Sequence, residues 1–335
     1  MGRTLRRITT LLVVSSIVPL LTWGTAGPAA SFTTDADRAD AAMAYVGAHQ
    51  LANGSFPGFS SIGSTADVVF DMAATGYGRI PDALGYLRRQ VRKGHVTGVG
   101  LTAKVVMAVT ATGRDPRHFG DANLIRRLRR TERASGRFDH GTVFDQALVI
   151  LALRSASVAP DENALAWLLH SQCPDGGWQW DRPHRAAENR HCRDTDDPND
   201  FYFSDTNTTA YAVMALGDVS GLSKSPFAFF DAIRDPTYHG WGSTWGFRRT
   251  DANSTALVIQ AYSSQDEDVP SGGMRALRRL QYPCGAVAFK FRNDGRRTGK
   301  DIGATIGAVL GFLREPLPVT PVTPTKPWAT ACPPD

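Results

Sequence analysis

Runs of small apolar residues recur along the chain at helical spacing, and each run opens on a Thr or, once, on a Gln. These anchors lie 37, 44, 63, 46 and 50 residues apart, and they are Thr65, Thr102, Gln146, Thr209, Thr255 and Thr305. Before each run comes a second segment, for example 161–172, with apolar residues on one face and polar residues on the other. Repeats of about this length usually copy one supersecondary unit. The pattern therefore predicts six helix pairs, each with a half-exposed outer helix followed by an apolar inner helix.

The inner helices are expected to gather around one axis because they are rich in Ala, Gly, Ser and Thr. Small side chains let neighbouring helices approach closely, and six pairs close naturally into a double ring. We therefore predict an all-α protein in which residues 31–315 form an (α/α)6 toroid. An open solenoid is the alternative, but it would need polar capping repeats at both ends, and neither end of the repeat region has one.

The loops between outer and inner helices share a pattern. Loops 50–56 and 172–178 have Gln, then Gly four residues later, then an aromatic residue, and loops 237–241 and 281–285 keep part of this pattern. Together with the Thr-Ala starts of the inner helices, these loops resemble the repeats of the terpenoid cyclase and protein prenyltransferase superfamily, which includes squalene–hopene-type cyclases. The resemblance covers most of the chain and implies the same toroid. It does not select a function, because the fold also serves cobalamin-binding transport proteins and complement-type thioester domains.

The resemblance also points to the residues that would carry class II cyclisation. In those cyclases the middle Asp of a D-x-D-D-T-A motif protonates an alkene. This chain has the related segments 205–210 (DTNTTA) and 251–256 (DANSTA), with Asn207 and Asn253 in the place of the acid. Because an amide does not act as a strong proton donor, the resemblance implies that this protonation chemistry is missing. A D-x-D-D sequence at 194–197 is followed by Pro and Asn, which indicates a loop instead.

Three acidic residues, Asp205, Asp251 and Asp301, each stand four residues before an anchor Thr. Their main predicted role is to cap the inner helices, and the alternative is that some of them also contact a polar ligand group at one mouth of the ring. Aromatic side chains near the loops could stack on a ligand or stabilise a cation. The predicted ligand-binding residues are Asp205, Asn207, Tyr211, Trp241, Trp245, Asp251 and Asn253.

Residues 1–30 are a predicted signal peptide, because they begin with basic residues, continue with an apolar stretch and end with small residues. Its three Arg supply much of the formal net charge of +5, which leaves 5 − 3 = +2 for the mature chain. We therefore expect a secreted, extracellular protein with no membrane span in the mature chain and no nucleic-acid partner. The Pro- and Thr-rich residues 316–335 predict an extended tail, which could contact the cell wall.

Four cysteines in an exported chain predict two disulfides. Three pairings are possible, and we favour Cys173–Cys192 within one long insertion and Cys284–Cys332, which would tie down the tail. The same insertion carries an acidic segment, where a plain loop is favoured over a calcium site. The candidate calcium ligands are Asp194, Asp196, Asp197 and Asp200. No other metal or cofactor is predicted.

These observations favour a secreted binder that holds a small apolar, mixed or isoprenoid-like ligand in the middle of the ring. One alternative is a cyclase-type enzyme for a small isoprenoid that uses Asp205, Asp251 or Asp301. Another is a carbohydrate-active or cell-surface protein that uses Trp241 and Trp245. Paired catalytic carboxylates, which glycoside hydrolysis needs, do not stand out in the sequence.

Overall fold

The computed structural model describes residues 32–77, 80–139, 141–181, 192, 203–243, 249–323 and 326. The predicted signal peptide lies outside these ranges. Within them, no helix is long and apolar enough to cross a membrane.

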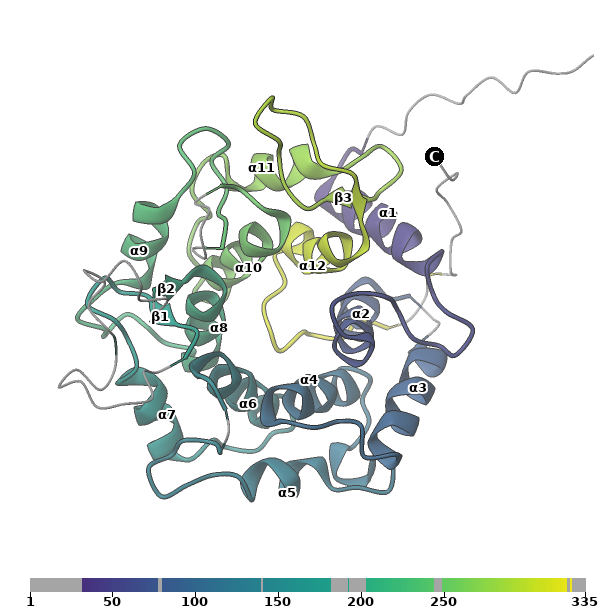
Figure 1. Ribbon diagram of the computed structural model, residues 1–335, viewed down its shortest axis with the longest axis vertical. Coiled ribbons are helices and arrows are strands. Elements are labelled where there is room, and N and C mark those ends of the chain that lie inside the picture. Colours follow the sequence, from purple (N-terminus) through teal and green to yellow (C-terminus); the bar gives the residue numbers. More distant parts are fainter. Residues whose placement is uncertain are drawn as a thin grey trace, which may run out of the picture.

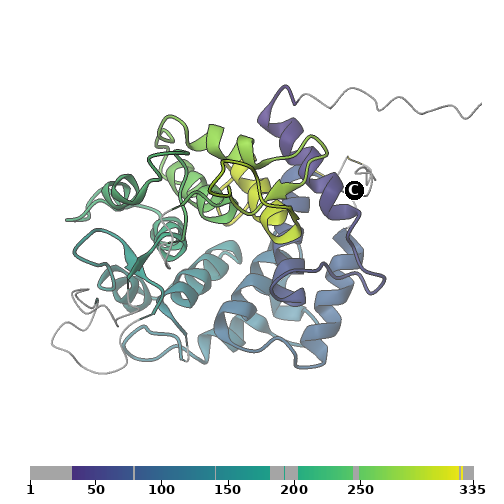
Figure 2. The same cartoon turned by 45° about the horizontal axis from the view of Figure 1, so that its top comes forward.

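Two concentric layers of helices form a ring (Figure 1, Figure 2). The outer helices are α1 (Asp35–Gly47), α3 (Ile80–Arg92), α5 (Leu124–Arg129), α7 (Glu162–Leu169), α9 (Pro226–Ile233) and α11 (Gly273–Leu280). The inner helices are α2 (Ser61–Thr75), α4 (Val99–Thr110), α6 (Val143–Ser155), α8 (Thr206–Leu216), α10 (Ala252–Ser263) and α12 (Ile302–Leu313). Outer and inner helices alternate along the chain, so the predicted (α/α)6 toroid is confirmed.

Short secondary-structure elements lie in the loops between the helices. A 3-10 turn, η1, covers Pro116–His118. Strand β1 (Trp178–Gln179) pairs antiparallel with β2 (Ser204–Asp205), and β3 (Val287–Ala288) pairs antiparallel with β4 (Lys300–Asp301). Each pair joins a loop to the start of the inner helix that follows it, so it fixes where that helix begins.

The anchor residues of the inner helices hold the preceding loops by hydrogen bonds. Their side-chain oxygens accept the backbone N–H of a loop residue at 2.9–3.1 Å, in the pairs Phe56–Thr65, Phe138–Gln146, Trp178–Thr209, Trp241–Thr255 and Val287–Thr305. In the second repeat, Thr102 instead donates to the Gly98 carbonyl at 2.7 Å. A buried backbone N–H must find a partner, which explains why one polar residue recurs at the same place on each apolar helix.

The loop glycines form the contacts between successive repeats. Four of them have a positive φ of 80–95°, a conformation that glycine adopts without strain. A Cβ at each would lie 2.0–2.6 Å from backbone atoms of the next outer helix or its N-cap, in the pairs Gly54–Asp82, Gly136–Asn163, Gly176–Ser225 and Gly285–Ala41. The loops therefore need glycine both for their turn and for this close backbone approach.

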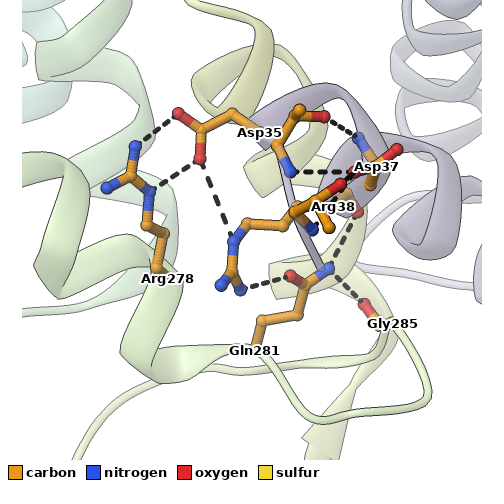
Figure 3. Close-up of polar contacts among 8 residues, drawn as sticks. Asp35, Asp37, Arg38, Arg278, Gln281 and Gly285 are labelled. Atoms are coloured by element: carbon orange, nitrogen blue, oxygen red, sulfur yellow. Dashed lines mark hydrogen bonds and ion pairs between the residues drawn. The ribbon is translucent and has the colours of Figure 1, made fainter. Parts of the chain in front are cut away.

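The last of these contacts closes the ring. Gly285 follows α11 yet lies against Ala41 of α1. Beside it, Gln281 Nε2 donates to the carbonyls of Arg38 at 2.8 Å and of Gly285 at 3.1 Å (Figure 3). The Arg278 guanidinium makes two 2.6 Å bonds to the Asp35 carboxylate. First and last repeats thus meet through the same kind of contact as neighbours in the sequence, and an open solenoid is excluded.

The start of the C-terminal tail packs across one end of the ring. Leu317 is buried, and its backbone N–H donates to Met214 Sδ at 3.4 Å. Further on, the Val322 N–H donates to the Ala73 carbonyl at 2.9 Å. Met214 and Ala73 lie near the C-terminal ends of α8 and α2, and Figure 1 shows the yellow segment after α12 crossing the middle of the ring. This part of the tail is therefore bound to the toroid itself.

One of the two predicted disulfides is confirmed. Cys173 and Cys192 are bonded, with their Cα atoms 5.3 Å apart. Cys332 lies outside the described residues, so the Cys284–Cys332 pair stays a prediction.

Replacing the ring-closing glycine should weaken the fold more than its backbone angle alone explains. In Gly285→Ala the new Cβ would lie 2.0 Å from the Ala41 carbonyl, and φ is +95°. Gly94→Ala is the matched control, because φ is +73° there but no atom lies within 4 Å. We expect a loss of about 1–2 kcal/mol in the control and a further ~1–3 kcal/mol in Gly285→Ala. Chemical denaturation of both variants measures the difference, and equal losses would contradict the role of this contact in ring closure.

Candidate functional site

A cavity of about 280 Å³ lies in the middle of the ring. It is lined by residues of α2, α6, α8, α10 and α12, and by Leu317 of the tail. Along α2, α8, α10 and α12 the lining positions recur at spacings of three or four residues, as in Asn253, Leu257 and Gln260 of α10, and α6 contributes Phe144. One face of each of these helices therefore points to the same space, and the tail covers one end of it.

Four residues that line this cavity carry buried side-chain oxygens that have no hydrogen-bond partner within the described part of the chain. The oxygens are Asp71 Oδ2, Asn207 Oδ1, Asn253 Oδ1 and Gln260 Oε1. The Gln260 amide is oriented by a bond from its Nε2 to the Ala256 carbonyl at 3.2 Å. A buried polar atom without a partner costs about 1–3 kcal/mol. The wall of the cavity therefore holds polar side chains whose hydrogen-bonding capacity the described part of the chain does not use.

An ion pair lies at the α2–α4 side of the cavity. Lys104 Nζ of α4 is 2.8 Å from both carboxylate oxygens of Asp67. The two side chains keep 20% and 32% of their surface accessible, respectively. Burial lowers the pKa of the Lys104 ammonium, but the neighbouring Asp67 charge outweighs this effect and leaves the pKa raised. The Lys104 ammonium therefore stays charged at neutral pH and pairs with the Asp67 carboxylate.

A second carboxyl group, Asp71, lies one helical turn from Asp67 on α2 and is only 2% exposed. Burial raises the pKa of the Asp71 carboxyl well above its usual range, and the nearby negative charge of Asp67 adds to the effect. Burial therefore favours the protonated form of Asp71, in which the carboxyl group has a hydroxyl donor. Asn207, Asn253 and Gln260 add three amide side chains to the same wall.

Three of the sequence-predicted ligand residues, Asn207, Tyr211 and Asn253, line the central cavity. Tyr211 packs edge-on against Phe144 with ring centroids 5.0 Å apart, which continues the wall on the α6 side. The two Asn residues that occupy the expected acid positions therefore face the shared cavity, and each contributes one of the unpartnered oxygens.

The three predicted caps are helix N-caps, as expected. Asp205, Asp251 and Asp301 accept the backbone N–H three residues ahead, each at 2.7 Å. None of them lines the central cavity. Burial raises the pKa of the Asp205 and Asp251 carboxyls, partly offset by the capping hydrogen bonds.

Trp241 does not reach the central cavity. Its ring is fully buried, and its Nε1 donates to the Phe230 carbonyl at 2.8 Å. It packs in a cluster with Phe229, Phe230 and Tyr262. The ring therefore serves packing, because the loop turns it outward between the helix layers.

The remaining predicted site residues fall on parts of the chain that the structure leaves undescribed. These are Trp245 and the possible calcium ligands Asp194, Asp196, Asp197 and Asp200. Among the described residues, no group of three or more His, Cys, Asp or Glu side chains is arranged to hold a metal ion.

Three charged residues at the cavity, Asp67, Asp71 and Lys104, were not among the predicted site residues, yet the sequence contains a signal for them. Asp67 and Asp71 stand four residues apart inside the otherwise apolar helix 61–75, and Lys104 stands two residues after the Thr102 anchor of the next inner helix. Charged residues inside apolar inner helices are costly to bury. Their presence marks the helix faces that line a cavity.

The comparisons with known proteins agree with this fold. No protein-family model and no curated protein matches the sequence. A protein from Actinoplanes is similar in structure, with 16% identity and a TM-score of 0.57, over 84% of this chain and 99% of that one. The type II terpene cyclase MstE from Scytonema is similar at 15% identity and a TM-score of 0.56, over 84% of this chain and 97% of that one.

A variant of MstE has been solved in complex with geranylgeranyl dihydroxybenzoate, its substrate. It matches at 14% identity and a TM-score of 0.53, over 84% of this chain and 96% of that one. At such low identity these likenesses show a shared α/α toroid fold.

The neutral state of Asp71 should appear in the pH dependence of stability. Because its folded-state pKa is raised, the folded protein keeps a proton that the unfolded chain releases above about pH 4. The wild type therefore loses stability as the pH rises from about 4 toward the folded pKa, by up to ~1.4 kcal/mol per pH unit from this group. The Asp71→Asn variant should lack this loss, so its stability relative to the wild type should increase with pH.

Urea denaturation of both proteins between pH 4 and neutrality measures this difference. The exposed Asp268→Asn variant controls for the loss of a surface carboxylate. Parallel pH curves for Asp71→Asn and the wild type would show that Asp71 ionises as an ordinary carboxyl group.

Proposed function

We propose that this chain is an exported protein that binds a small, neutral, amphipathic molecule in its central cavity, of the class of a hydroxyl-bearing isoprenoid. The observation that carries the proposal is that four residues with unpartnered side-chain oxygens line one cavity whose remaining wall is largely apolar. A ligand that supplies the missing hydrogen-bonding partners and also contacts the apolar rest of the wall would have one polar end and an apolar body.

The charges favour a neutral ligand. Asp67 and Lys104 form an ion pair, and burial raises the pKa of the Asp71 carboxyl, which favours its neutral form. A ligand with a net charge would therefore enter without an opposite charge to meet it, at a large desolvation cost. A hydroxyl group fits better, because it can donate to the oxygen of Asn207, Asn253 or Gln260 and accept from the Asp71 hydroxyl.

The volume limits the size of the ligand. About 280 Å³ is the liquid volume of roughly nine water molecules, so the ligand has on the order of ten non-hydrogen atoms. Phe70, Phe144, Leu257, Ile306 and Leu310 provide apolar contacts for its body. The isoprenoid class is favoured by these contacts and by the fold shared with MstE, whose substrate carries a geranylgeranyl chain. This cavity suits a much shorter chain.

A cyclase-type activity is the second candidate, and the position of Asp71 favours it over the three acids predicted from the sequence. The carboxylates of Asp205, Asp251 and Asp301 are used as helix caps, whereas Asp71 lines the cavity and burial raises its pKa, which favours the protonated acid. However, a raised pKa makes a weak acid, and protonating an alkene requires a strong one. Binding is therefore the better-supported function, and Asp71 would be the acid if turnover occurs.

The proposed function predicts that geraniol, a ten-carbon alcohol, stabilises the protein more than myrcene, a ten-carbon hydrocarbon without a hydroxyl group. In Gln260→Leu this preference should shrink, with geraniol binding about fivefold weaker, because a hydrogen bond contributes about 1 kcal/mol. The same variant should be slightly more stable without ligand, because it no longer buries an unpartnered oxygen.

Thermal shift and calorimetric titration measure these effects, since a ligand that binds the folded state raises the melting temperature. Equal responses to geraniol and myrcene, or unchanged geraniol binding by Gln260→Leu, would contradict the proposal. Gas chromatography of the same mixtures tests for turnover. If the wild type forms a product that Asp71→Asn no longer forms, the protein is an enzyme rather than a binding protein.

A further inference from the structure

A second cavity lies on the outer side of the ring, at the junction between the last and first repeats. It has a volume of about 720 Å³ and is formed by the start of α1, the end of α11 and the loop 282–297. It shares no lining residue with the central cavity. Figure 3 shows two of its residues, Arg38 and Arg278, on either side of Asp35. We call this cavity the arginine cleft.

The wall of the arginine cleft is strongly basic. Among the described residues, no Asp or Glu lines it, whereas five Arg do: Arg38, Arg278, Arg279, Arg296 and Arg297. One carboxylate lies behind the wall, because Asp35 binds Arg278 through two 2.6 Å bonds and lies 3.9 Å from Arg38. Asp294 in the same loop uses Oδ1 to accept the Arg296 backbone N–H and adds a second negative charge nearby. About three positive charges therefore remain unbalanced at the cleft.

Aromatic rings and backbone groups hold these guanidinium groups in place. Arg297 lies 4.1 Å from the centroid of the Tyr282 ring and also donates to the Gln281 carbonyl. Arg279 lies 5.3 Å from the centroid of the Phe291 ring. Cation–π contacts of this kind fix the planes of the guanidinium groups and leave edge donors for a ligand. The cleft is thus organised before anything binds.

The arrangement is unfavourable for the protein alone. Burial lowers the pKa of the Arg38 guanidinium, and the nearby Arg278 charge lowers it further, against the opposite effect of Asp35. Like charges held together in one cleft repel each other and destabilise the folded state. An anion that bridges several of these groups would relieve this repulsion.

We propose that the arginine cleft binds an anion that carries two or more phosphate groups. Guanidinium forks match phosphate oxygens in geometry, and a single carboxylate would leave most of the positive charge unbalanced. The volume suits a small molecule rather than a single ion. The Phe291 ring stacks on Tyr238 at 4.3 Å and Arg297 covers Tyr282, so these rings are not free to stack on nucleic-acid bases. A soluble oligophosphate is therefore favoured over nucleic acid.

Calorimetric titration of the purified protein with inorganic pyrophosphate tests this proposal. We expect one site, an affinity that falls as the salt concentration rises, and weaker binding of single phosphate. The double variant Arg279→Gln/Arg296→Gln removes two charges that the structure does not use in ion pairs among the described residues. It should weaken pyrophosphate binding at least tenfold.

Arg275→Gln is the matched control, because Arg275 is exposed on the same helix, α11, but does not line the cleft. It should bind pyrophosphate like the wild type. Equal weakening by Arg275→Gln would show non-specific charge attraction, and no binding of pyrophosphate at millimolar concentration would also overturn the proposal. Binding of single-stranded DNA without pyrophosphate binding would reassign the cleft to nucleic acid.

A second experiment distinguishes two sources of the phosphate groups, a membrane lipid and a soluble molecule. Phosphatidylcholine vesicles with and without cardiolipin, whose headgroup carries two phosphates, test for a lipid ligand by sedimentation. If cardiolipin vesicles carry down the wild type but not the double variant, and pyrophosphate competes, the phosphates are lipid-borne. If vesicles do not bind while pyrophosphate does, the ligand is soluble. Both results would support the site, and neither depends on the central cavity.

Discussion

The close approach of a loop glycine to the next outer helix is the contact on which the whole ring depends. It recurs at Gly54, Gly136 and Gly176, and Gly285 repeats it against Ala41 of the first helix. Because the same contact both joins neighbouring repeats and closes the circle, the toroid has no free end to cap. The anchor Thr and Gln residues complete the joint by accepting the N–H groups of the loops.

Closure has a direct consequence for function. Helices α2, α6, α8, α10 and α12 must each turn one face toward a shared cavity, and the polar residues on those faces are then brought together from distant parts of the sequence. Leu317 of the tail covers the end near the helix C-termini. The result is a small cavity lined by one buried carboxyl group and three amide side chains, each with an oxygen that has no hydrogen-bonding partner among the described residues. The arginine cleft arises at the same junction that closes the ring.

Much of the fold could be predicted from the sequence because its determinants are local and repeated. The anchor Thr residues, the loop glycines and the N-cap Asp205 act at fixed spacing within one repeat, so periodicity reveals them. The site was less predictable, because it depends on the rotation of each inner helix about its axis. That rotation brings Asp71 into the cavity, while the path of its loop turns Trp241 into the core. Both depend on how the whole ring packs.

A crystal structure of the purified protein at neutral pH is the most direct test of the central claim. We expect a closed ring, with Gly285 against Ala41, and a bound molecule whose polar atoms lie about 2.6–3.2 Å from the oxygens of Asn207, Asn253 or Gln260. An open ring, or an empty cavity in which these amides pair with each other and with Asp71, would contradict it.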